Sequence, residues 1–381
     1  MIKAFEQPIY VTRPYLPKRE LFCEGLKEIW ENRWLTNNGP VLKRFTQQLS
    51  NYFNTDNICI FNNGTLALQI GLQGMGISGE VITTSFTFVA TTHALFWNNI
   101  RPVFVDIEPD YYTLDPEKVE AAITPRTTSI LAVHVFGHPC KLKSLTDIAH
   151  RHKLKLIYDA AHAFGVQVGN QPISNFGDMS VFSFHATKPY HSIEGGMLTF
   201  QDSGLKKNFD YLKNFGFKNE IEVVMPGTNA KMNELQALMG SMLLEHVDKI
   251  NKKGKQITEV YREKLKGVPG IHLVPGLPKD VLYNYAYMPI EVDEDEFCMS
   301  RDGLYEELKK YNIFSRRYFY PLICDYPCYR NVAVKDPLTV ARKVTSRILT
   351  LPTYYDLDLD DVERICDIII AIRLEVNSCQ N

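Results

Sequence analysis

The chain has 381 residues, of which 45% are hydrophobic, 12% aromatic and 23% charged, and its formal net charge is −2. This length is sufficient for one large domain and a smaller one, each with its own core. The balanced charge and the lack of any run of like charges argue against a nucleic-acid partner or an acidic or basic tail.

The cysteines and the apolar runs indicate a reducing, aqueous compartment. The eight cysteines are scattered through apolar or strand-like stretches, where thiols act as small hydrophobic side chains. The opening residues have no apolar segment of the length that a signal peptide needs, and Glu6 argues against a transit peptide. The longest apolar runs, such as 368–372, are far too short to span a membrane. We therefore expect a cytoplasmic protein without a membrane partner.

Alternating strands and helices are predicted from residue 57 onward. The strands are expected at 57–61, 80–84, 101–107, 128–135 and 153–160, and the helices at 65–76, 88–99, from Asp115-Pro116 and at 142–152. Strands that alternate with helices in this way form a mostly parallel sheet covered by helices. Such sheets bind ligands at the carboxyl ends of their strands, so functional residues should follow strands directly.

The second half of the chain predicts a smaller α+β unit. A long helix is expected over 233–266, with the passage between domains near 248–254. A strand near 283–292, a helix at 299–312 and a final helix from Asp360 follow. We predict an α/β protein with an N-terminal arm and large domain at 1–247 and a small C-terminal domain at 248–381.

The stretch "FNNGTLAL" (61–68) joins a predicted strand to a helix that starts at Gly64 and Thr65. The first amides of a helix have no partner within it, so the helix start either receives a simple cap or binds an anion such as phosphate. The Rossmann and Walker glycine patterns are both missing here, which argues against a nicotinamide or a nucleoside triphosphate.

The stretch "KLIYDAAHAFG" (155–165) ends a predicted buried strand with Asp159, and His162 follows. A carboxylate at the end of a buried strand needs a partner, which a helix cap, a structural lysine or a cationic ring nitrogen of a ligand can supply. His162 taken alone fits a core or loop histidine equally well.

Lys188 lies between two predicted buried strands in "SFHATKPYHSIEGGML" (183–198). Pro189 disfavours a helical conformation for Lys188, so its backbone is expected to be extended or in a turn. A lysine near hydrophobic walls has a lowered pKa, and the neutral amine can attack a carbonyl. Ser183, five residues earlier, can donate a hydrogen bond to the anion that Thr65 faces. Considered alone, Lys188 is explained equally well as a solvated loop lysine.

Taken together, these strand ends predict a pyridoxal phosphate site. The helix start would bind the phosphate, Lys188 the aldehyde and Asp159 the pyridine nitrogen, so that the ring can accept electrons. Phe88 is placed to stack on the ring, although as a single residue it fits the core equally well.

With these residues in order, the chain resembles the DegT/DnrJ/EryC1/StrS family of sugar aminotransferases, which have the fold type I architecture of pyridoxal phosphate enzymes. The matching stretches are "WLTNNGP" (34–40), "NNGTLALQIGL" (62–72), "TSFTFVAT" (84–91), "PVFVDI" (102–107), "HVFGHPC" (134–140), "IYDAAHAFG" (157–165), "SFHATK" with "EGG" (183–196), "GTNAKMNELQA" (227–237) and "RILTLPTYY" (347–355). They extend through most of the chain and keep their order.

The resemblance implies a role for each site residue. Lys188 would form the Schiff base with pyridoxal phosphate and shuttle the proton as the cofactor cycles through pyridoxamine phosphate. Asp159 would pair with the ring nitrogen, and His162, often Gln in the family, would contact the ring on its phenolic oxygen side. The remaining cofactor contacts would come from Gly64, Thr65, Phe88 and Ser183, and from Asn229 of a neighbouring subunit.

The resemblance also implies a homodimer whose active sites are shared across the interface. Family members often have Tyr and Arg where this chain has Ala230 and Lys231, and Lys does not replace the planar guanidinium group of Arg. The substrate-binding residues would be Thr36, Asn38, His185, Arg316 and Tyr318. No metal site is expected.

Several stretches resemble most closely the family members that aminate C4 of a dTDP-4-keto-6-deoxyhexose. The expected reaction transfers the amino group of L-glutamate to dTDP-4-keto-6-deoxy-D-glucose, for bacterial surface polysaccharides or antibiotic sugars. Arg316, Arg317, Tyr318 and Tyr320 are candidates for the nucleotide-sugar site, although ion pairs and core packing are the alternatives. A 3-amino-sugar transferase and a non-catalytic, nucleotide-sugar-binding or regulatory paralogue remain open. Lys188 argues against the related dehydratases, which carry His at this position.

Overall fold

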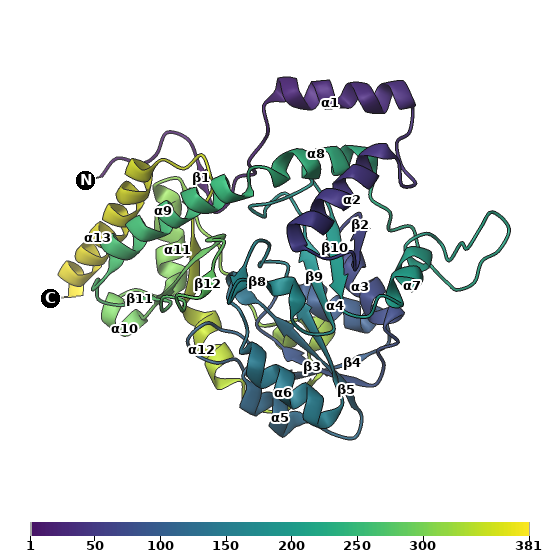
Figure 1. The fold of residues 1–381 in the computed structure, drawn as a ribbon. Helices are drawn as coiled ribbons and strands as arrows, with labels where there is room; N and C mark the ends of the chain where they lie inside the picture. Colours follow the sequence, from purple (N-terminus) through teal and green to yellow (C-terminus); the bar gives the residue numbers. More distant parts are fainter. Residues whose placement is uncertain (1, 381) are drawn as a thin grey trace.

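The protein is built around one large, mostly parallel β-sheet (Figure 1). The computed structural model describes the backbone of residues 2–380 and the side chains of residues 2–377. The strands of this sheet are β2 (Ile58–Phe61), β3 (Glu80–Thr84), β4 (Arg101–Val105), β5 (Thr127–Val133), β6 (Lys155–Asp159), β9 (Met179–Ser183), β10 (Gly196–Phe200) and β15 (Ala333–Val334). Their spatial order is β15-β4-β3-β5-β6-β9-β10-β2. Within this sheet β10 alone runs against the others, because it pairs antiparallel with both β9 and β2.

Helices cover both faces of the large sheet. They include α3 (Gly64–Gly74), α4 (Val89–Trp97) and α7 (Leu205–Leu212) on one face, and α5 (Pro116–Ala122) and α6 (Leu142–His152) on the other. Strand β6 shows why both faces are dry. Ile157 packs into the core under α3, α4 and α7, whereas Leu156 and Tyr158 pack into the core under α5 and α6. The predicted layered α/β architecture is therefore confirmed.

Local capping signals fix where these helices begin. The side chain of Asn63 accepts a hydrogen bond of 2.8 Å from the amide of Leu66 at the start of α3. Asp115 accepts one of 2.9 Å from the amide of Glu117, and Pro116 occupies the first turn of α5. The predicted strands and helices between residues 57 and 160 match the observed ones within a few residues.

A second, smaller sheet lies beside the large one, with the order β11-β13-β16. The elements of this unit are β11 (Ile271–Leu273), β13 (Met288–Val292), β14 (Ile313–Phe314), β16 (Ile348–Leu351), α11 (Arg301–Lys310), α12 (Thr339–Arg347) and α13 (Leu359–Gln380). The predicted division at residues 247 and 248 stays a prediction, and two segments cross it. Strand β1 (Ile9–Tyr10) pairs with β14, and β15 pairs with β4 of the large sheet.

The predicted single helix over 233–266 is wrong. The structure has two helices, α8 (Glu234–Leu244) and α9 (Val247–Leu265). Helix α8 and the start of α9, at Val247, bury apolar residues in the core of the large unit. From Ile257 onward, α9 instead packs into the core of the small unit. The two halves of this amphipathic segment pack into different cores, and the helix breaks so that each half can do so. The spacing of apolar residues along the sequence does not show which core each half contacts.

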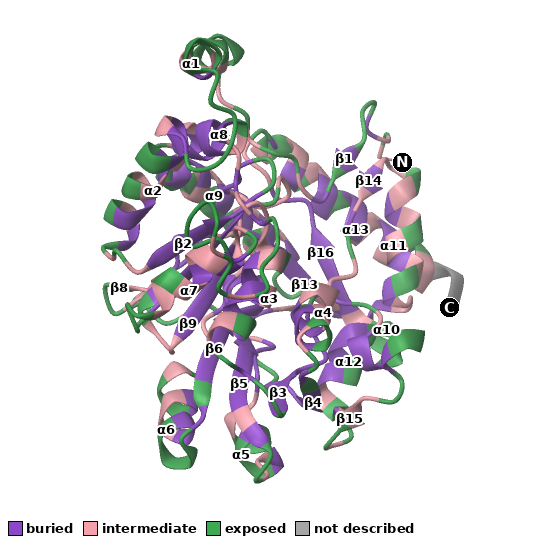
Figure 2. Ribbon diagram, turned by 90° about the vertical axis from the view of Figure 1, so that its right-hand side faces the viewer, coloured by how far each residue is buried: buried purple, intermediate pink, exposed green. Residues whose placement is uncertain are grey.

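Helix α1 (Arg19–Asn32) stands apart from the sheets (Figures 1 and 2). Figure 2 shows most of its surface exposed, whereas the strands of the large sheet are buried along most of their length. Leu21 and Trp30 are among the large apolar side chains that α1 exposes. Within residues 2–380, no helix combines the length and the apolar character needed to cross a membrane.

Candidate active site

The carboxyl ends of β2, β3, β6 and β9 meet at one edge of the large sheet and open into a cavity of about 710 Å³. Parallel strands end at the same edge, so residues far apart in the sequence come together there. The sequence-predicted residues that line this cavity are Gly64, Thr65, Phe88, Asp159, His162, Ser183, His185, Lys188, Arg316 and Tyr318. The small unit contributes the last two, together with Phe319 and Tyr287.

The start of helix α3 forms one wall of the cavity. The side chain of Asn63 caps the amide of Leu66, which leaves the amides of Gly64 and Thr65 as the free donors of the first turn. A Cβ at Gly64 would lie 3.0 Å from Cβ of Ser183, so glycine lets this turn approach the end of β9. Together the amides and the hydroxyls of Thr65 and Ser183 can surround an anion.

Asp159 ends β6 as a buried carboxylate with few partners. One oxygen accepts a hydrogen bond of 2.8 Å from the hydroxyl of Thr91, and the other accepts one of 3.1 Å from the amide of Ala161. Burial raises the pKa of Asp159, and these two hydrogen bonds and the charge of Lys188 oppose that rise. A cation in the cavity would therefore favour the ionised carboxylate.

Thr91 was not found from the sequence, although a signal for it exists. It lies on α4 one turn after Thr87, whose hydroxyl is 3.0 Å from that of Thr91. Thr87 precedes α4 and Thr91 lies in its first turn, and both are buried, so their one-turn spacing indicates a polar partner outside the helix.

Lys188 lies in a turn after β9, as predicted from Pro189. Its amide donates to the carbonyl of His185 at 2.9 Å, and its Nζ donates to the hydroxyl of Tyr287 at 2.9 Å. Burial lowers the pKa of Lys188 to about 8, and the charge of Asp159 opposes this shift. Tyr287 was missed because it comes from the small unit, and no local sequence signal connects it to Lys188.

His162 lies against an aromatic wall of the cavity. Its Nδ1 accepts a hydrogen bond of 3.2 Å from the amide of Phe136, and its ring centroid is 4.5 Å from that of Tyr287. Burial lowers the pKa of His162 well below its ordinary value, and the charge of Lys188 adds to this effect. His162 is therefore neutral at pH 7 and carries its proton on Nε2.

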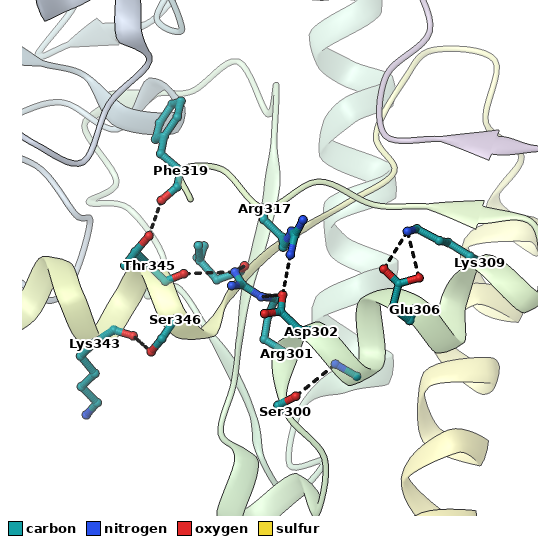
Figure 3. Close-up of polar contacts among 12 residues, drawn as sticks. Ser300, Arg301, Asp302, Glu306, Lys309, Arg317, Phe319, Lys343, Thr345 and Ser346 are labelled. Carbon is teal, nitrogen blue, oxygen red and sulfur yellow. Dashed lines mark hydrogen bonds and ion pairs between the residues drawn. The ribbon is translucent and has the colours of Figure 1, made fainter. Parts of the chain in front are cut away.

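On the side formed by the small unit, the four candidate residues of 315–322 separate into two groups. Arg316 and Tyr318 line the cavity, and the guanidinium carbon of Arg316 lies 5.5 Å from the ring centroid of Tyr318. Arg317 instead pairs with Asp302 at 2.8 Å (Figure 3). Its guanidinium carbon also lies 5.2 Å from the ring centroid of Tyr320. The alternative of an ion pair and aromatic packing therefore applies to Arg317 and Tyr320.

His185 lies at the rim of the cavity. Its Nδ1 is 2.8 Å from the hydroxyl of Thr187, and its Nε2 is 3.4 Å from a carboxylate oxygen of Glu194. His191, which has no predicted role, makes a structural contact instead, because its Nε2 is 2.9 Å from the carbonyl oxygen of Tyr15.

Thr36, Asn38 and Asn229 are not brought into this cavity by the described chain. Asn38 lines a second cavity of about 640 Å³, together with Lys231. The side-chain oxygen of Asn229 accepts a hydrogen bond of 2.8 Å from Lys231, so both predicted loops lie on the same side of the molecule. Their predicted contacts with substrate and cofactor stay predictions.

A buried carboxylate joins these two loops. Glu234 accepts hydrogen bonds of 3.1 and 2.8 Å from the amides of Gly39 and Val41, and so caps helix α2 (Pro40–Phe53) from the start of α8. Its own amide donates to the carbonyl of Leu35 at 3.0 Å. This contact was not predicted, because Glu234 reads as an ordinary first-turn residue of α8.

The donor set of the first cavity fits pyridoxal phosphate. The first turn of α3 offers free amides to a phosphate, Asp159 offers a carboxylate to a ring nitrogen, and Lys188 offers an amine with a lowered pKa to an aldehyde. The exposed ring of Phe88 lines the same space.

The sequence of residues 18–370 matches the model of the DegT/DnrJ/EryC1/StrS aminotransferase family. The chain belongs to this family. It is therefore an aminotransferase by descent, and the resemblance seen in its motifs is confirmed over nearly the whole length.

Two curated relatives of this DegT/DnrJ/EryC1/StrS aminotransferase are dTDP-4-amino-4,6-dideoxy-D-glucose transaminases. The one from Shigella dysenteriae is 43% identical over 369 residues, which are 97% of this chain and 100% of the relative. The one from Escherichia coli is 44% identical over 371 residues, which are 96% of this chain and 99% of the relative.

The aminotransferase is also similar to the crystal structure of DesI determined in the presence of its TDP-sugar product. The two chains are 35% identical and superpose with a TM-score of 0.93, covering 99% of this chain and 96% of the other. The predicted aminotransferase fold is thereby confirmed.

Proposed function

We propose that this aminotransferase uses pyridoxal phosphate to transfer the amino group of L-glutamate to C4 of dTDP-4-keto-6-deoxy-D-glucose, which gives dTDP-4-amino-4,6-dideoxy-D-glucose. The observation that carries the proposal is the meeting of Lys188, Asp159 and the free amides of α3 around one cavity. The 43 and 44% identity to two transaminases that bear this product's name supports the choice of sugar.

The residues of the cavity divide the work of the reaction. Bound pyridoxal phosphate supplies an aldehyde carbon and a ring that accepts electrons from the carbon that bears the amine. Asp159 holds a proton on the ring nitrogen, and the first turn of α3 with Ser183 holds the phosphate. Lys188 would hold the aldehyde carbon in the resting enzyme, and its amine, when free, would carry the proton at the carbon that bears the amine.

Neighbouring groups prepare Lys188 and the ring for this task. The hydroxyl of Tyr287 accepts a hydrogen bond from Nζ of Lys188 and fixes the direction of the amine. Neutral His162 and the ring of Phe88 exclude water from the ring edge and face. Arg316 and Tyr318 offer a guanidinium group and an aromatic face to the sugar nucleotide.

The active enzyme is proposed to be a homodimer with shared active sites. Asn229 would complete the phosphate site of the partner subunit, and Thr36 and Asn38 would contact its substrate. The position of Asn38 and Asn229 on one side of the molecule, away from the cavity of their own chain, supports this assembly. The exposed apolar residues of α1 suit a subunit interface. We propose that the protein works in the cytoplasm.

The test is to incubate the purified enzyme with pyridoxal phosphate, L-glutamate and dTDP-4-keto-6-deoxyglucose, and to identify the product by NMR. The expected result is 2-oxoglutarate together with a sugar aminated at C4. A matched reaction with the 3-keto isomer of the dTDP-sugar tests the alternative of a 3-amino-sugar transferase.

Borohydride reduction and peptide mapping test the proposal independently of the sugar. The expected adduct is on Lys188, and Lys188→Ala is expected to abolish turnover while the circular dichroism spectrum stays that of a folded protein. No adduct, or an adduct on another lysine, would favour the non-catalytic paralogue.

A further inference from the structure

Arg316, Tyr318 and Phe319 form the wall of the cavity on the side of the small unit. Arg317, in the same segment, belongs to a charged cluster with Arg301 and Asp302, which is called here the Asp302 bracket (Figure 3). One carboxylate oxygen of Asp302 accepts hydrogen bonds of 2.8 Å from Nε of Arg301 and of 2.8 Å from Nη1 of Arg317. A single acceptor therefore joins two guanidinium groups from different segments.

Arg301 anchors the bracket in the core of the small unit. It is only 2% exposed, and its Nη1 donates to the carbonyls of Thr345 at 3.1 Å and Ile348 at 2.8 Å. These carbonyls lie at the end of α12, where a helix leaves its last acceptors without partners. A buried charge is stable only with such contacts, so the position of Arg301 is fixed.

The main chain of the wall is fixed by the same elements. The hydroxyl of Thr345 donates to the carbonyl of Phe319, whose ring lines the cavity (Figure 3). At the other end of the wall, the amide of Arg316 donates to the carbonyl of Thr350 at 3.1 Å, and its carbonyl accepts from the amide of Thr350 at 2.7 Å.

The bracket holds one of two adjacent arginines, and the other lines the cavity. Asp302 holds the side chain of Arg317, and the rings of Tyr305 and Tyr320 lie 4.6 and 5.2 Å from its guanidinium carbon. Among the described residues, Arg316 is the only arginine that lines the cavity.

We propose that the Asp302 bracket positions Arg316 and Tyr318 for the diphosphate and sugar of the amino acceptor, an assignment that rests on the proposed function. The groups at the reacting atoms are held by other contacts, because Lys188 bonds Tyr287 and Asp159 bonds Thr91. The bracket therefore acts on acceptor binding and leaves the reaction with glutamate unchanged. Asp302 and Arg317 are positioning residues.

The two halves of the reaction can be measured separately in the variants Asp302→Asn and Arg317→Met. In the first measurement, the enzyme loaded with pyridoxal phosphate is mixed with glutamate, and the change in cofactor absorbance is recorded over a single turnover. In the second, the pyridoxamine phosphate form of the enzyme is mixed with dTDP-4-keto-6-deoxyglucose and recorded in the same way. Because a hydrogen bond to a charged group is lost, we expect the KM for the acceptor to rise about tenfold. The rate and KM with glutamate should stay within about twofold of wild type.

Binding of dTDP alone, measured by calorimetry, gives a readout that needs no catalysis. The Kd for dTDP is expected to rise about tenfold in Asp302→Asn, in line with the acceptor KM. If Asp302→Asn does not fold, Arg317→Met carries the test, because the side chain of Arg317 is 34% exposed and tolerates replacement.

Lys309→Met is the matched control (Figure 3). Lys309 bonds Glu306 at 2.8 and 3.0 Å and lies 4.1 Å from the ring centroid of Tyr305, but it makes no contact with the wall. It should leave both half-reactions and dTDP binding unchanged.

Equal losses in both half-reactions, or unchanged acceptor KM and dTDP binding in the folded variants, would overturn the role of the bracket. If the wild-type enzyme binds dTDP but does not aminate the 4-keto sugar, the proposed function fails. In that case, the change in the Kd for dTDP between wild type and the variants still tests the role of the bracket.

Discussion

The pKa of Lys188 decides how much of its amine is free to react. Burial lowers this pKa to about 8, from an ordinary value of 10.5, and the charge of Asp159 limits the shift. The folded protein therefore holds about a tenth of its Lys188 as free amine at pH 7, roughly three hundredfold more than a lysine with the ordinary pKa would.

This pKa predicts the pH dependence of cofactor capture. The ammonium form has no lone pair, so the rate at which the cofactor-free enzyme captures pyridoxal phosphate should rise about tenfold per pH unit up to pH 8 and then level off. Stopped-flow absorbance measures this rate. Asp159→Asn removes the charge that stabilises the ammonium form, so its midpoint should lie at lower pH. A wild-type midpoint near 10.5 would contradict the prediction.

Thr91 is predicted to tune Asp159. Thr91→Val removes the 2.8 Å hydrogen bond to the carboxylate, so the pKa of Asp159 should rise further and its grip on a ring nitrogen should weaken. A hydrogen bond to a charged group contributes about 1.5–3 kcal/mol, so cofactor affinity should fall at least about tenfold. Equilibrium titration with pyridoxal phosphate measures the change.

Thr92 offers the matched control on the same helix. Its hydroxyl is buried without a hydrogen-bond partner among the described residues. Thr92→Val should therefore leave cofactor affinity unchanged and leave stability equal or slightly higher. Equal losses in both variants would show that the effect belongs to α4 as a whole.

Among single residues, the sequence predicts the site residues that directly follow strands. It misses the residues that hydrogen-bond to them from other segments. Gly64, Asp159 and Lys188 were predicted because strand ends are readable from alternating patterns. Tyr287 was missed because it comes from the small unit and no local pattern connects it to Lys188. The spacing of Thr87 and Thr91 indicates a polar partner, but it does not identify that partner as Asp159.

Close approach between β10 and the start of α3 sets the shape of the anion-binding turn. A Cβ at Gly196 would lie 2.6 Å from backbone atoms of Asn63 and Gly64, and backbone atoms cannot move aside as a flexible side chain can. The glycine therefore shapes the turn that is proposed to bind the phosphate, although it does not line the cavity.

Gly196→Ala is predicted to shift this turn. Overpacking of this kind costs about 1–3 kcal/mol, so the midpoint of urea unfolding should fall and cofactor affinity should fall with it. Gly276→Ala is the control, because no atom lies within 4 Å of a Cβ at that position. An unchanged cofactor affinity in Gly196→Ala would show that the turn tolerates displacement.

The elements themselves were largely predictable between residues 57 and 160, where strand and helix periods alternate and caps mark the boundaries. The break between α8 and α9 was not. Residues 233–266 keep one apolar spacing, and the break at Glu245–His246 contains neither Gly nor Pro. Such a break depends on which core lies beside each half of the segment, and that information is not local.

At the scale of the whole molecule, shared active sites predict complementation between inactive subunits. Lys188→Ala and Asn229→Ala each damage a different half of the site. In a hybrid dimer, the intact Lys188 of one chain would meet the intact Asn229 of the other. An equal mixture of exchanging subunits should therefore recover about a quarter of wild-type activity, since half of the dimers are hybrids with one complete site each.

Coexpression with two affinity tags isolates the hybrid for this assay. A dimer of two Lys188→Ala subunits serves as the background. If the isolated hybrid is no more active than the Asn229→Ala dimer, Asn229 acts within its own chain or not at all, and the shared site is refuted.

Helix α9 crosses from the core of the large unit at Val247 to the core of the small unit at Ile257, without interruption. A helix that loses its packing at one end frays toward the other, because each turn is held by the next. The two cores thus share one continuous helix, α9, in addition to being connected along the chain. Heating should therefore melt them together, in one cooperative transition on calorimetry, and the catalytic cavity between them should disappear in a single step.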